Sequence, residues 1–402
     1  MRICLCIPYF PPVMGGAERQ ASLLASKLVE SGDDVTVVTR HLPGQPAREV
    51  SGGVRIHRAI RPGRRGALFG LGYMLSLLAF FADPRARFEV VQAYGIHLGA
   101  YIACRLRPRR GFRVVVRPMS FGPIGDLAML AQMRFWPLWQ GGDAPTRGHL
   151  LRTIQEADAL VALSRDLAAE LIAHGFPSHR IVQIANGVPL PETLWEPSRA
   201  KMTRQSLGIP ADPLLLFVGR LDRHKGAVDL LRAVPALVKR YPKLLVILLG
   251  DGPLREELTS LAVESGVSTH VRLSGVADPT PFLQAADAFV LPTLGEGMSN
   301  ALLEAMAAGL PCVTTRVAGN MEVIAHGDTG LLVEPGNPEE LQHAIARLLD
   351  DPNLAFRMGR DARQRVRVAY SAERMVASYR ELFARLTAGM GPHDDGPNQK
   401  GN

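Results

Sequence analysis

Short apolar runs alternate with amphipathic helical patterns along this chain, and the alternation starts afresh after residue 190. Strands that are separated by helices need crossover connections, so each series predicts a parallel sheet covered by helices. The fold class is therefore α/β, with two doubly wound domains. The expected strands are ICLCI, DVTVVT, VRIHRAI, FEVVQAY, FRVVVRP and ADALVALS in the first series, and LLLFVGR, LLVILLGDG, VRLSG, AFVLPT, PCVTT and GLLV in the second.

The domain boundaries follow from this second start and from the proline-rich segment PLPETLWEPSRAKM beside it. We expect an N-terminal domain over residues 1–190 and a second domain over 191–370. A further helix within 371–388 follows a short hinge and is expected to cross back to the first domain. Residues 389–402 are polar and rich in Gly and Pro, which predicts a disordered tail. Because ligands bind at the carboxyl ends of parallel strands, two facing domains would hold a substrate in the cleft between them.

The positive charge of the chain is concentrated in its first half. The net charge is +8 overall, +10 over residues 1–190 and −2 over 191–402. The apolar run 67–82 has 16 residues, fewer than the ~20 that span a bilayer, so it predicts a buried or interfacial helix. With its arginines it is a candidate for contact with an anionic membrane surface, and a solvated basic face explains the charge equally well. The clustered arginines are Arg61, Arg64, Arg65, Arg105, Arg107, Arg109 and Arg110.

Nucleic-acid binding is not expected, since neither interleaved aromatic residues nor a helix-turn-helix pattern accompanies the charge. The four cysteines lack the spacing of a zinc site, and Cys4 and Cys6 lie two apart on one strand, where they share a face without bridging. The N-terminal residues form a strand rather than a signal peptide. A cytoplasmic location is the expectation, with peripheral contact at the inner face of the membrane as a further candidate.

The segment GEGMSNALLEAMAAGLPCVTT carries the strongest chemical signal. A strand ends at Pro292, a glycine-containing loop follows, and a helix begins near Ser299. Backbone N–H groups at the start of a helix favour an anion, whereas Glu296 and Glu304 suit sugar hydroxyls better than a bare phosphate. A phosphate that carries a sugar on each side would use both features. The N–H groups concerned are those of Gly297, Met298, Ser299 and Asn300.

Two further segments carry candidate phosphate contacts. In FVGRLDRHKG, Arg220 and Lys225 follow a strand that ends at Gly219, and two such cations can neutralise a diphosphate and stabilise it as a leaving group. Two solvated loop cations are the alternative. Near the start, Gly15 and Gly16 separate the first strand from its helix, where the backbone can approach a ligand closely. This pair does not form G-x-G-x-x-G, so a nicotinamide-binding domain is not supported.

Together these segments resemble the family 4 glycosyltransferases. The segments GRLDRHKG, GDGPLREEL, VRLSG, EGMSNALLEAMAAGLPCVTT and GDTGLLV are similar to the family's second domain in order and spacing, and PPVMGGAERQASLLASKL, ALVALS and IANGV to its first. The similarity covers nearly the whole chain. It implies a GT-B fold of two facing Rossmann-like domains, an NDP-sugar donor, retention at the anomeric carbon, and no requirement for a metal or other cofactor.

The resemblance also assigns roles to the candidate residues. Arg220 and Lys225 would hold the diphosphate, Glu304 the ribose hydroxyls, and Glu296 the hydroxyls of the donor sugar. The amides of residues 297–300 would complete the cradle. Gly15 and Gly16 would meet the donor phosphates from the opposite domain. The backbone around Gly275 and Val276 would face the nucleobase.

Two departures from the family pattern concern the first domain. Where many members have a histidine that contacts the donor sugar, this chain has Arg117 to Ser120, and Gln92 and Tyr94 replace the histidines after the preceding strand. His97 is nearby and is interpreted as a helix-start residue. No general base is therefore identified, which a retaining front-face mechanism tolerates because the departing diphosphate can take the acceptor proton.

The resemblance implies transfer of a hexosyl or N-acetylhexosaminyl unit from a UDP- or GDP-sugar to a glycan or lipid-linked acceptor, in bacterial cell-surface polysaccharide synthesis. The N-terminal domain would bind the acceptor. Three alternatives stay open: a sugar-nucleotide epimerase of the same fold, a catalytically silent sugar-nucleotide-binding partner, and a membrane-associated scaffold that uses the 67–82 helix.

Overall fold

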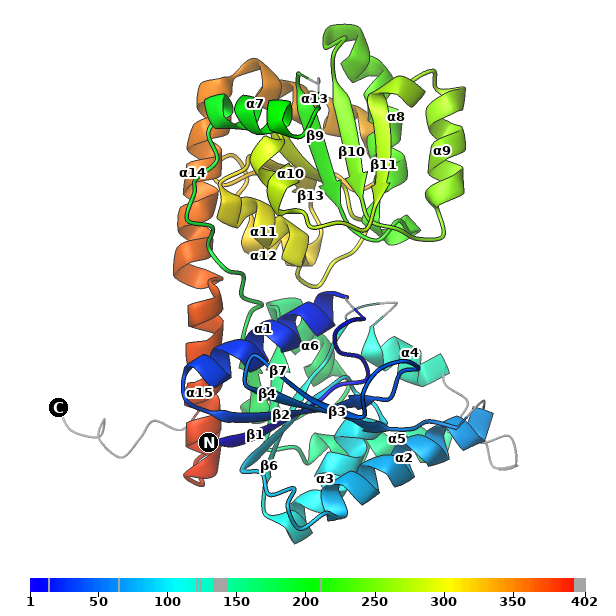
Figure 1. Ribbon diagram of the computed structural model, residues 1–402, viewed down its shortest axis with the longest axis vertical. Coiled ribbons are helices and arrows are strands. Elements are labelled where there is room, and N and C mark those ends of the chain that lie inside the picture. Colours follow the sequence, from blue (N-terminus) through cyan, green and yellow to red (C-terminus); the bar gives the residue numbers. More distant parts are fainter. Residues whose placement is uncertain are drawn as a thin grey trace, which may run out of the picture. The chain divides into compact units, whose positions relative to one another are not determined.

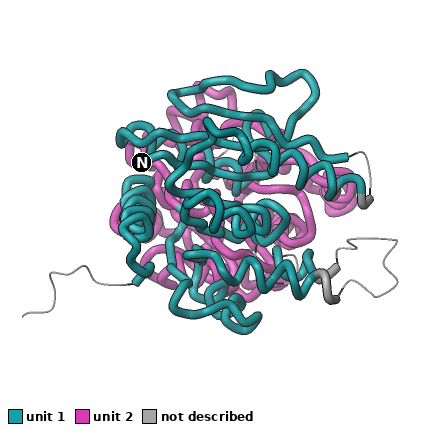
Figure 2. The backbone as a smooth tube through the Cα atoms, turned by 90° about the horizontal axis from the view of Figure 1, so that it is seen from below, with its two compact units in different colours: residues 1–186, 372–402 teal, residues 187–371 magenta. Residues whose placement is uncertain are grey.

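The computed structural model describes residues 1–13, 15–63, 66–120, 122, 125–132, 144–209 and 212–393. The chain divides into two compact units, drawn in different colours in Figure 2. Unit 1 comprises residues 1–186 and 372–402, and unit 2 comprises residues 187–371. Arg64 and Arg65 of the basic cluster, and residues 394–402 of the predicted tail, lie outside the described residues.

Unit 1 is built on an eight-stranded sheet with the order β3-β4-β2-β1-β5-β6-β7-β8. Every neighbouring pair is parallel except β3 and β4, which are antiparallel. The apolar runs predicted as strands therefore form one parallel sheet with an antiparallel edge. The strands are β1 (Arg2–Cys6), β2 (Asp34–Arg40), β3 (Arg48–Ser51), β4 (Val54–Ile60), β5 (Val90–Tyr94), β6 (Arg113–Arg117), β7 (Ala159–Ala162) and β8 (Ile181–Gln183).

Helices cover both faces of this sheet, with α1 and α15 on one face and α2 and α3 on the other (Figure 1). The core on the α1 side includes Ile3 and Leu5 of β1 and six side chains of α15. The C-terminal helix is thus part of the first unit's core. The helices of unit 1 are α1 (Gly16–Glu30), α2 (Gly66–Ala82), α3 (Leu98–Arg110), α4 (Asp126–Gln132), α5 (Ala144–Gln155), α6 (Arg165–Ala173), the 3₁₀ helix η2 (Ser178–Arg180) and α15 (Ala372–Thr387).

Unit 2 contains a six-stranded parallel sheet with the order β11-β10-β9-β12-β13-β14. Its strands are β9 (Leu214–Val218), β10 (Leu245–Leu249), β11 (Val271–Gly275), β12 (Ala288–Leu291), β13 (Cys312–Thr315) and β14 (Leu331–Val333). Its helices are α7 (Pro197–Ser206), η3 (Arg223–Lys225), α8 (Ala227–Arg240), α9 (Arg255–Glu264), η4 (Ser268–His270), α10 (Thr280–Ala285), α11 (Asn300–Ala308), α12 (Ala318–Val323), α13 (Pro338–Asp350) and α14 (Pro352–Ala369).

The proline-rich segment after β8 packs onto unit 2. Trp195 is buried, and its indole N–H donates to the carbonyl oxygen of Ala286 at 2.7 Å. Arg363 of α14 donates to the carbonyl oxygens of Pro191 and Ala307. These contacts explain why the first unit ends at Asn186 in the structure, four residues before the expected end at 190.

All four cysteines are free and buried. Cys6 faces α3, where its Sγ lies 3.3 Å from the position that a Cβ on Gly99 would take. Burial raises the pKa of the Cys6 thiol to about 12, so this side chain is a neutral core residue at physiological pH. The prediction that Cys4 and Cys6 do not bridge each other is confirmed.

An ion pair between a buried arginine and a partly exposed aspartate fastens α7 to the second sheet. Arg204 is 4% exposed and donates to Asp287 at 2.6 Å, and Asp287 also accepts from the backbone N–H of Leu214 at 2.7 Å. Removing one member of such a pair leaves the other charged and unpaired. We therefore expect Arg204→Ala to lower the free energy of unfolding by about 3–5 kcal/mol.

Denaturant unfolding monitored by circular dichroism measures this effect. Lys201→Ala is the matched control, because Lys201 is an exposed cation on the same helix. Equal stabilities of the two variants would contradict the structural role of the pair.

Candidate functional site

The order of the strands in the second sheet reverses between β9 and β12. At such a switch point the loops after the two strands diverge and leave room for a ligand at the carboxyl edge. The loop after β9 contains Arg220 and Lys225, and the loop after β12 contains Glu296. The structure thus brings these three sequence-predicted residues to one edge of one sheet.

A short 3₁₀ helix, η3, shapes the loop after β9. Asp222 caps it, its side-chain oxygen accepting from the backbone N–H of Lys225 at 3.2 Å. Arg220 is 72% exposed and lies 3.7 Å from Asp222 through its Nε. The guanidinium of Arg220 therefore projects into solvent from a loop whose backbone is fixed, and it can turn toward an anion.

The loops after β9 and β12 touch through their backbones at Gly226. This residue has φ +69°, and a Cβ here would lie 1.8 Å from the carbonyl oxygen of Pro292. The carbonyl oxygen of His224 accepts from the backbone N–H of Leu294 and from the hydroxyl of Thr293, both at 2.7 Å. Glycine is required at this position because the conformation and the close approach both exclude a side chain.

Lys225 and Glu296 form an ion pair across the switch point. Their side chains are 24% and 16% exposed, so water screens the charges only in part. The sequence predicts a role for each residue separately, but it contains no local signal that two residues 71 positions apart are in contact. Their pairing places a cation and a carboxylate side by side, which suits a ligand with a phosphate next to sugar hydroxyls.

The helix α11 begins beside Glu296, as predicted. Ser299 is its N-cap, with its hydroxyl oxygen accepting from the backbone N–H of Leu302. Met298 and Ser299 are buried, whereas Gly297 and Asn300 are partly exposed. Glu304 lies one turn into the helix and is also partly exposed, so the two carboxylates and the helix start belong to one continuous segment.

The loop after β11 reaches the same edge. Gly275 has φ +72°, and its carbonyl oxygen accepts from the backbone N–H of Gly250 at 2.7 Å. Val276 follows with 78% of its surface exposed. The resemblance assigns the backbone around Gly275 and Val276 to the nucleobase, and that role stays a prediction.

In unit 1 the corresponding reversal lies between β1 and β5. Gly15 is the N-cap of α1 and Gly16 is its first residue, so both follow β1 at this second switch point. Their neighbour Met14 lies outside the described residues. Gly15 and Gly16 stand at the N-terminus of a helix of 15 residues, an end that favours an anion, and their contact with the donor phosphates stays a prediction.

Sequence reasoning missed Asp126, which organises the carboxyl edge of the first sheet. Its carboxylate accepts from the backbone N–H groups of Ile96, Met119 and Ser120, and from the hydroxyl of Ser120 at 2.8 Å. It thereby joins the loops after β5 and β6. A single aspartate at the start of a short helix gives no sequence signal for this role.

His97 is the N-cap of α3, as the sequence predicts. Its Nδ1 accepts from the backbone N–H of Gly99 at 3.1 Å, and its Nε2 is buried without a hydrogen-bond partner among the described residues. Burial lowers the pKa of His97, although the carboxylate of Asp126 opposes that shift. The imidazole is therefore held neutral at the carboxyl edge of β5.

The residues that replace the family's histidines are internal. Gln92, Tyr94 and Arg117 are no more than 3% exposed. Arg117 donates to Asn186 at 2.6 Å, and its guanidinium lies over the ring of Tyr94. These side chains tie the sheet to the last residue of the unit's first segment. Within the described part of the chain, no group of three or more His, Cys, Asp or Glu side chains is arranged to hold a metal ion.

Two family models match successive parts of the chain. "Glycosyltransferase Family 4" matches residues 14–191, and "Glycosyl transferases group 1" matches residues 200–365. The lipopolysaccharide core biosynthesis glycosyltransferase LpsE of Rhizobium meliloti is 32% identical over 245 residues, which are 60% of this chain and 68% of LpsE. The chain belongs to the group 1 glycosyltransferases.

Solved structures give this glycosyltransferase the GT-B fold. A sucrose-phosphate synthase from Thermosynechococcus elongatus superposes with a TM-score of 0.79 at 24% identity, over 96% of this chain and 99% of the synthase. HepE of Anabaena, in complex with UDP-glucose, superposes with a TM-score of 0.74 at 18% identity, over 97% of this chain and all of that one. The predicted fold class is confirmed.

Gly226 offers a sharp test of how the glycosyltransferase builds this edge. Gly226→Ala should destabilise the protein by about 2–5 kcal/mol, because a positive φ and a backbone clash add together. Gly266→Ala is the control: its φ of +68° is nearly the same, but nothing lies within 4 Å of its Cβ position. We expect only the ~1–2 kcal/mol of the left-handed conformation there. Chemical denaturation measures both, and equal losses would contradict the close contact.

Proposed function

We propose that the enzyme moves a hexosyl or N-acetylhexosaminyl unit from a UDP- or GDP-sugar to a glycan or lipid-linked acceptor, with retention at the anomeric carbon. The observation that carries the proposal is the Lys225–Glu296 pair at the switch point of the second sheet. Glu296 lies four residues before the first residue of α11, whose N-terminal backbone N–H groups favour an anion, and Lys225 pairs with it.

On this proposal the cations bind the diphosphate of the donor, and the carboxylates bind its two sugars. The ammonium group of Lys225 and the exposed guanidinium of Arg220 neutralise the diphosphate, and the amides of residues 297–300 face it. Glu296 accepts hydrogen bonds from the donor sugar and Glu304 from the ribose. Gly15 and Gly16 meet the phosphates from unit 1. The solved complex of HepE with UDP-glucose supports a nucleotide-sugar donor, because HepE shares the fold.

The reaction on this proposal needs no protein base. As the bond from the anomeric carbon to the diphosphate oxygen breaks, negative charge develops on the diphosphate, where Lys225 and Arg220 stabilise it. The same diphosphate oxygen takes the proton of the acceptor hydroxyl as that hydroxyl attacks from the same face. The enzyme contributes position and electrostatics, and we propose that it requires no metal ion.

We further propose a role in bacterial cell-surface polysaccharide synthesis on the cytoplasmic side of the membrane. The similarity to LpsE, which is named for lipopolysaccharide core biosynthesis, supports the pathway class. Lipid-linked acceptors are anchored in a membrane, so an enzyme that uses them gains from a surface that rests on the bilayer.

Helix α2 supplies a candidate membrane-contacting surface. Five of its large apolar side chains are at least 37% exposed: Leu68, Phe69, Leu71, Leu75 and Leu78. No helix among the residues that the structure describes is long and apolar enough to cross a bilayer. An apolar helix face of this kind lies in the interface rather than across it.

Flotation with vesicles tests this surface. We expect the wild type to float with vesicles that contain anionic phosphatidylglycerol, and Leu68→Ser/Leu75→Ser to lose at least about tenfold in binding, since each buried leucine contributes ~1.5–3 kcal/mol. Ile172→Ser on α6 is the control, because Ile172 is 50% exposed and lies elsewhere in unit 1. Undiminished flotation of the double variant would refute the role of α2.

The ion pair at the switch point yields the principal kinetic test. Lys225→Ala should lower kcat/KM for the donor about 10- to 100-fold, since a hydrogen bond to a charged group contributes ~1.5–3 kcal/mol. Lys239→Ala, on the exposed surface of the following helix α8, is the control. The double variant Lys225→Met/Glu296→Met removes both charges, so a purely structural pair predicts that transfer persists in it. Transfer at the wild-type rate by that double variant would overturn the assignment.

Three further measurements separate the proposal from its alternatives. Nuclear magnetic resonance of the product reports whether the anomeric configuration is retained. Transfer in the presence of EDTA tests the metal requirement. Incubation with the donor alone distinguishes an epimerase, which would convert the donor without any acceptor, from a silent binding partner, which would bind the nucleotide and leave it intact.

A further inference from the structure

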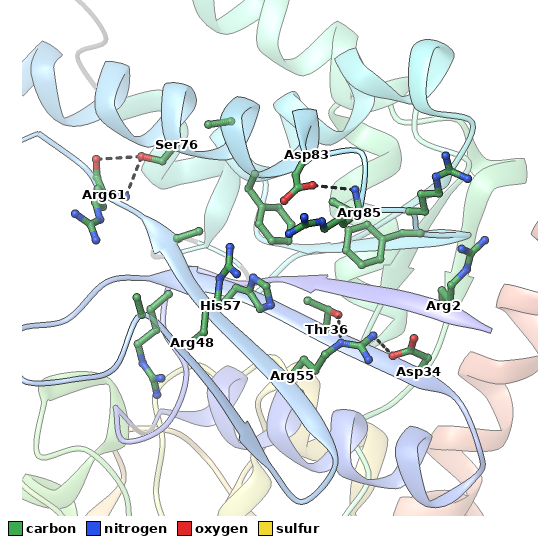
Figure 3. Close-up of a pocket in the computed structure, with 18 residues that line it drawn as sticks. Arg2, Asp34, Thr36, Arg48, Arg55, His57, Arg61, Ser76, Asp83 and Arg85 are labelled. Carbon is green, nitrogen blue, oxygen red and sulfur yellow. Dashed lines mark hydrogen bonds and ion pairs between the residues drawn. The ribbon is translucent and has the colours of Figure 1, made fainter.

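Unit 1 contains a pocket that the proposed reaction does not use. It lies between the sheet, at β2 to β4, and the C-terminal half of α2 with the turn that follows (Figure 3). Its volume is about 670 Å³, within the range of small-molecule sites. None of its lining residues belongs to the loops after β1, β5 or β6, so it is separate from the switch point at which Gly15 and Gly16 lie.

The lining of this pocket is strongly basic. It has two carboxylates, Asp34 and Asp83, and seven arginines: Arg2, Arg48, Arg55, Arg58, Arg61, Arg85 and Arg87. The side chain of Arg58 is accounted for elsewhere, since it is 1% exposed and donates to Glu49 and to the carbonyl oxygen of Pro11. Six arginine side chains therefore remain against two aspartates.

Those two aspartates are already engaged. Asp34 pairs with Arg55, whose Nε also lies 3.4 Å from the hydroxyl oxygen of Thr36. Asp83 accepts from the backbone N–H of Arg85 at 2.8 Å. Among the described residues, no acidic side chain pairs with the guanidinium of Arg48, Arg61 or Arg85. Within the part of the chain that the structure describes, these three arginines around the pocket thus have no acidic side chain paired with them.

The pKa of His57, one of the residues that line the pocket, depends on the charges around it. His57 lies on β4 beside Arg48, as Figure 3 shows, with its ring edge-on to Phe80 at 5.6 Å. Burial lowers the pKa of His57, the charges of Arg48 and Arg55 lower it further, and Asp83 opposes them. The charged side chains near the ring are thus Arg48 on β3 and Arg55 on β4, which are positive, and Asp83 directly after α2, which is negative, so the surroundings of His57 carry a net positive charge.

One wall of the pocket is aromatic. Phe80 of α2 and Phe88 of the following turn stack at 6.1 Å with an interplanar angle of 19°. A planar guanidinium group can donate two parallel hydrogen bonds to two oxygens of one phosphate. Aromatic rings pack against sugar rings and against acyl or base moieties. The lining thus has arginines that can bind the phosphate of a phosphate ester and aromatic rings that can pack against its organic part.

We propose that this pocket is a second binding site of the enzyme, for a phosphate-bearing ligand whose phosphate lies near Arg48 and Arg85, the two arginines without an acidic partner among the described residues that flank His57 and Asp83, and whose organic part contacts Phe80 and Phe88. The phosphate can come from a soluble phosphate ester or from the headgroup of an anionic phospholipid. The two sources share the chemistry that the arginines recognise.

His57 makes the proposal testable without reference to catalysis. In protein labelled with ¹³C-histidine, comparison with His57→Gln assigns its imidazole resonance. Inorganic pyrophosphate is the soluble probe, and vesicles of phosphatidylcholine with phosphatidylglycerol are the lipid probe. We expect one of them to perturb this resonance, and the bound anion to raise the pKa of His57 by favouring the imidazolium form. Sodium chloride at equal ionic strength separates binding from screening.

The variant Arg48→Ala/Arg85→Ala should weaken the effect of the active probe at least about tenfold, because two charge-assisted contacts are lost. Arg105→Ala/Arg109→Ala removes the same charge from the exposed side of α3 and should leave the effect unchanged. A response to pyrophosphate indicates a soluble ligand, and a response to the anionic vesicles alone indicates a headgroup. A His57 resonance that neither probe moves, or that both double variants affect equally, overturns the proposal.

Discussion

Direct contact between backbones holds the carboxyl edge of the second sheet together, and the candidate site depends on it. A Cβ on Gly226 would lie 1.8 Å from the carbonyl oxygen of Pro292, one on Gly250 would lie 1.8 Å from that of Gly219, and one on Gly319 would lie 2.4 Å from that of Glu296. The loops after neighbouring strands are therefore closer than side chains would permit. This crowding fixes Lys225 and Glu296 near each other before any ligand arrives, so less ordering is needed when a donor binds.

Much of the fold follows from the sequence because parallel strands have a clear pattern. Runs such as LLVILLG are buried on both faces and read as continuous apolar segments, and helices between them leave only crossover connections. The start of α11 at its N-cap Ser299 is predicted equally well, since a serine that caps a helix is a local sequence signal. The exact end of the first segment of unit 1 cannot be predicted from the sequence, because it depends on hydrogen bonds of Trp195 and Arg363 to residues far along the chain.

The chemistry of the site was predicted only in part, for the same physical reason. Motif positions identify Lys225 and Glu296 one at a time, but their ion pair is a property of the folded sheet. The arginines show this most clearly. In the sequence they form one basic half, whereas the structure separates buried ones such as Arg58 and Arg117, which hold loops and the sheet together, from Arg48 and Arg85, which line a hollow. Net charge alone cannot make that distinction.

The return of α15 to the first unit has a consequence for synthesis. Its side chains Met375, Tyr379 and Phe383 complete the core that residues from the first strands begin, yet all 185 residues of unit 2 are translated in between. At ~5–20 residues per second, that interval lasts roughly 10–40 s. During this time α15 is not yet available to cover the apolar surface of unit 1 that it packs on, so the nascent chain exposes a hydrophobic surface that chaperones can bind. Unit 2, which is one continuous segment, can finish folding first. Unit 1, although most of it is translated earlier, completes its core last.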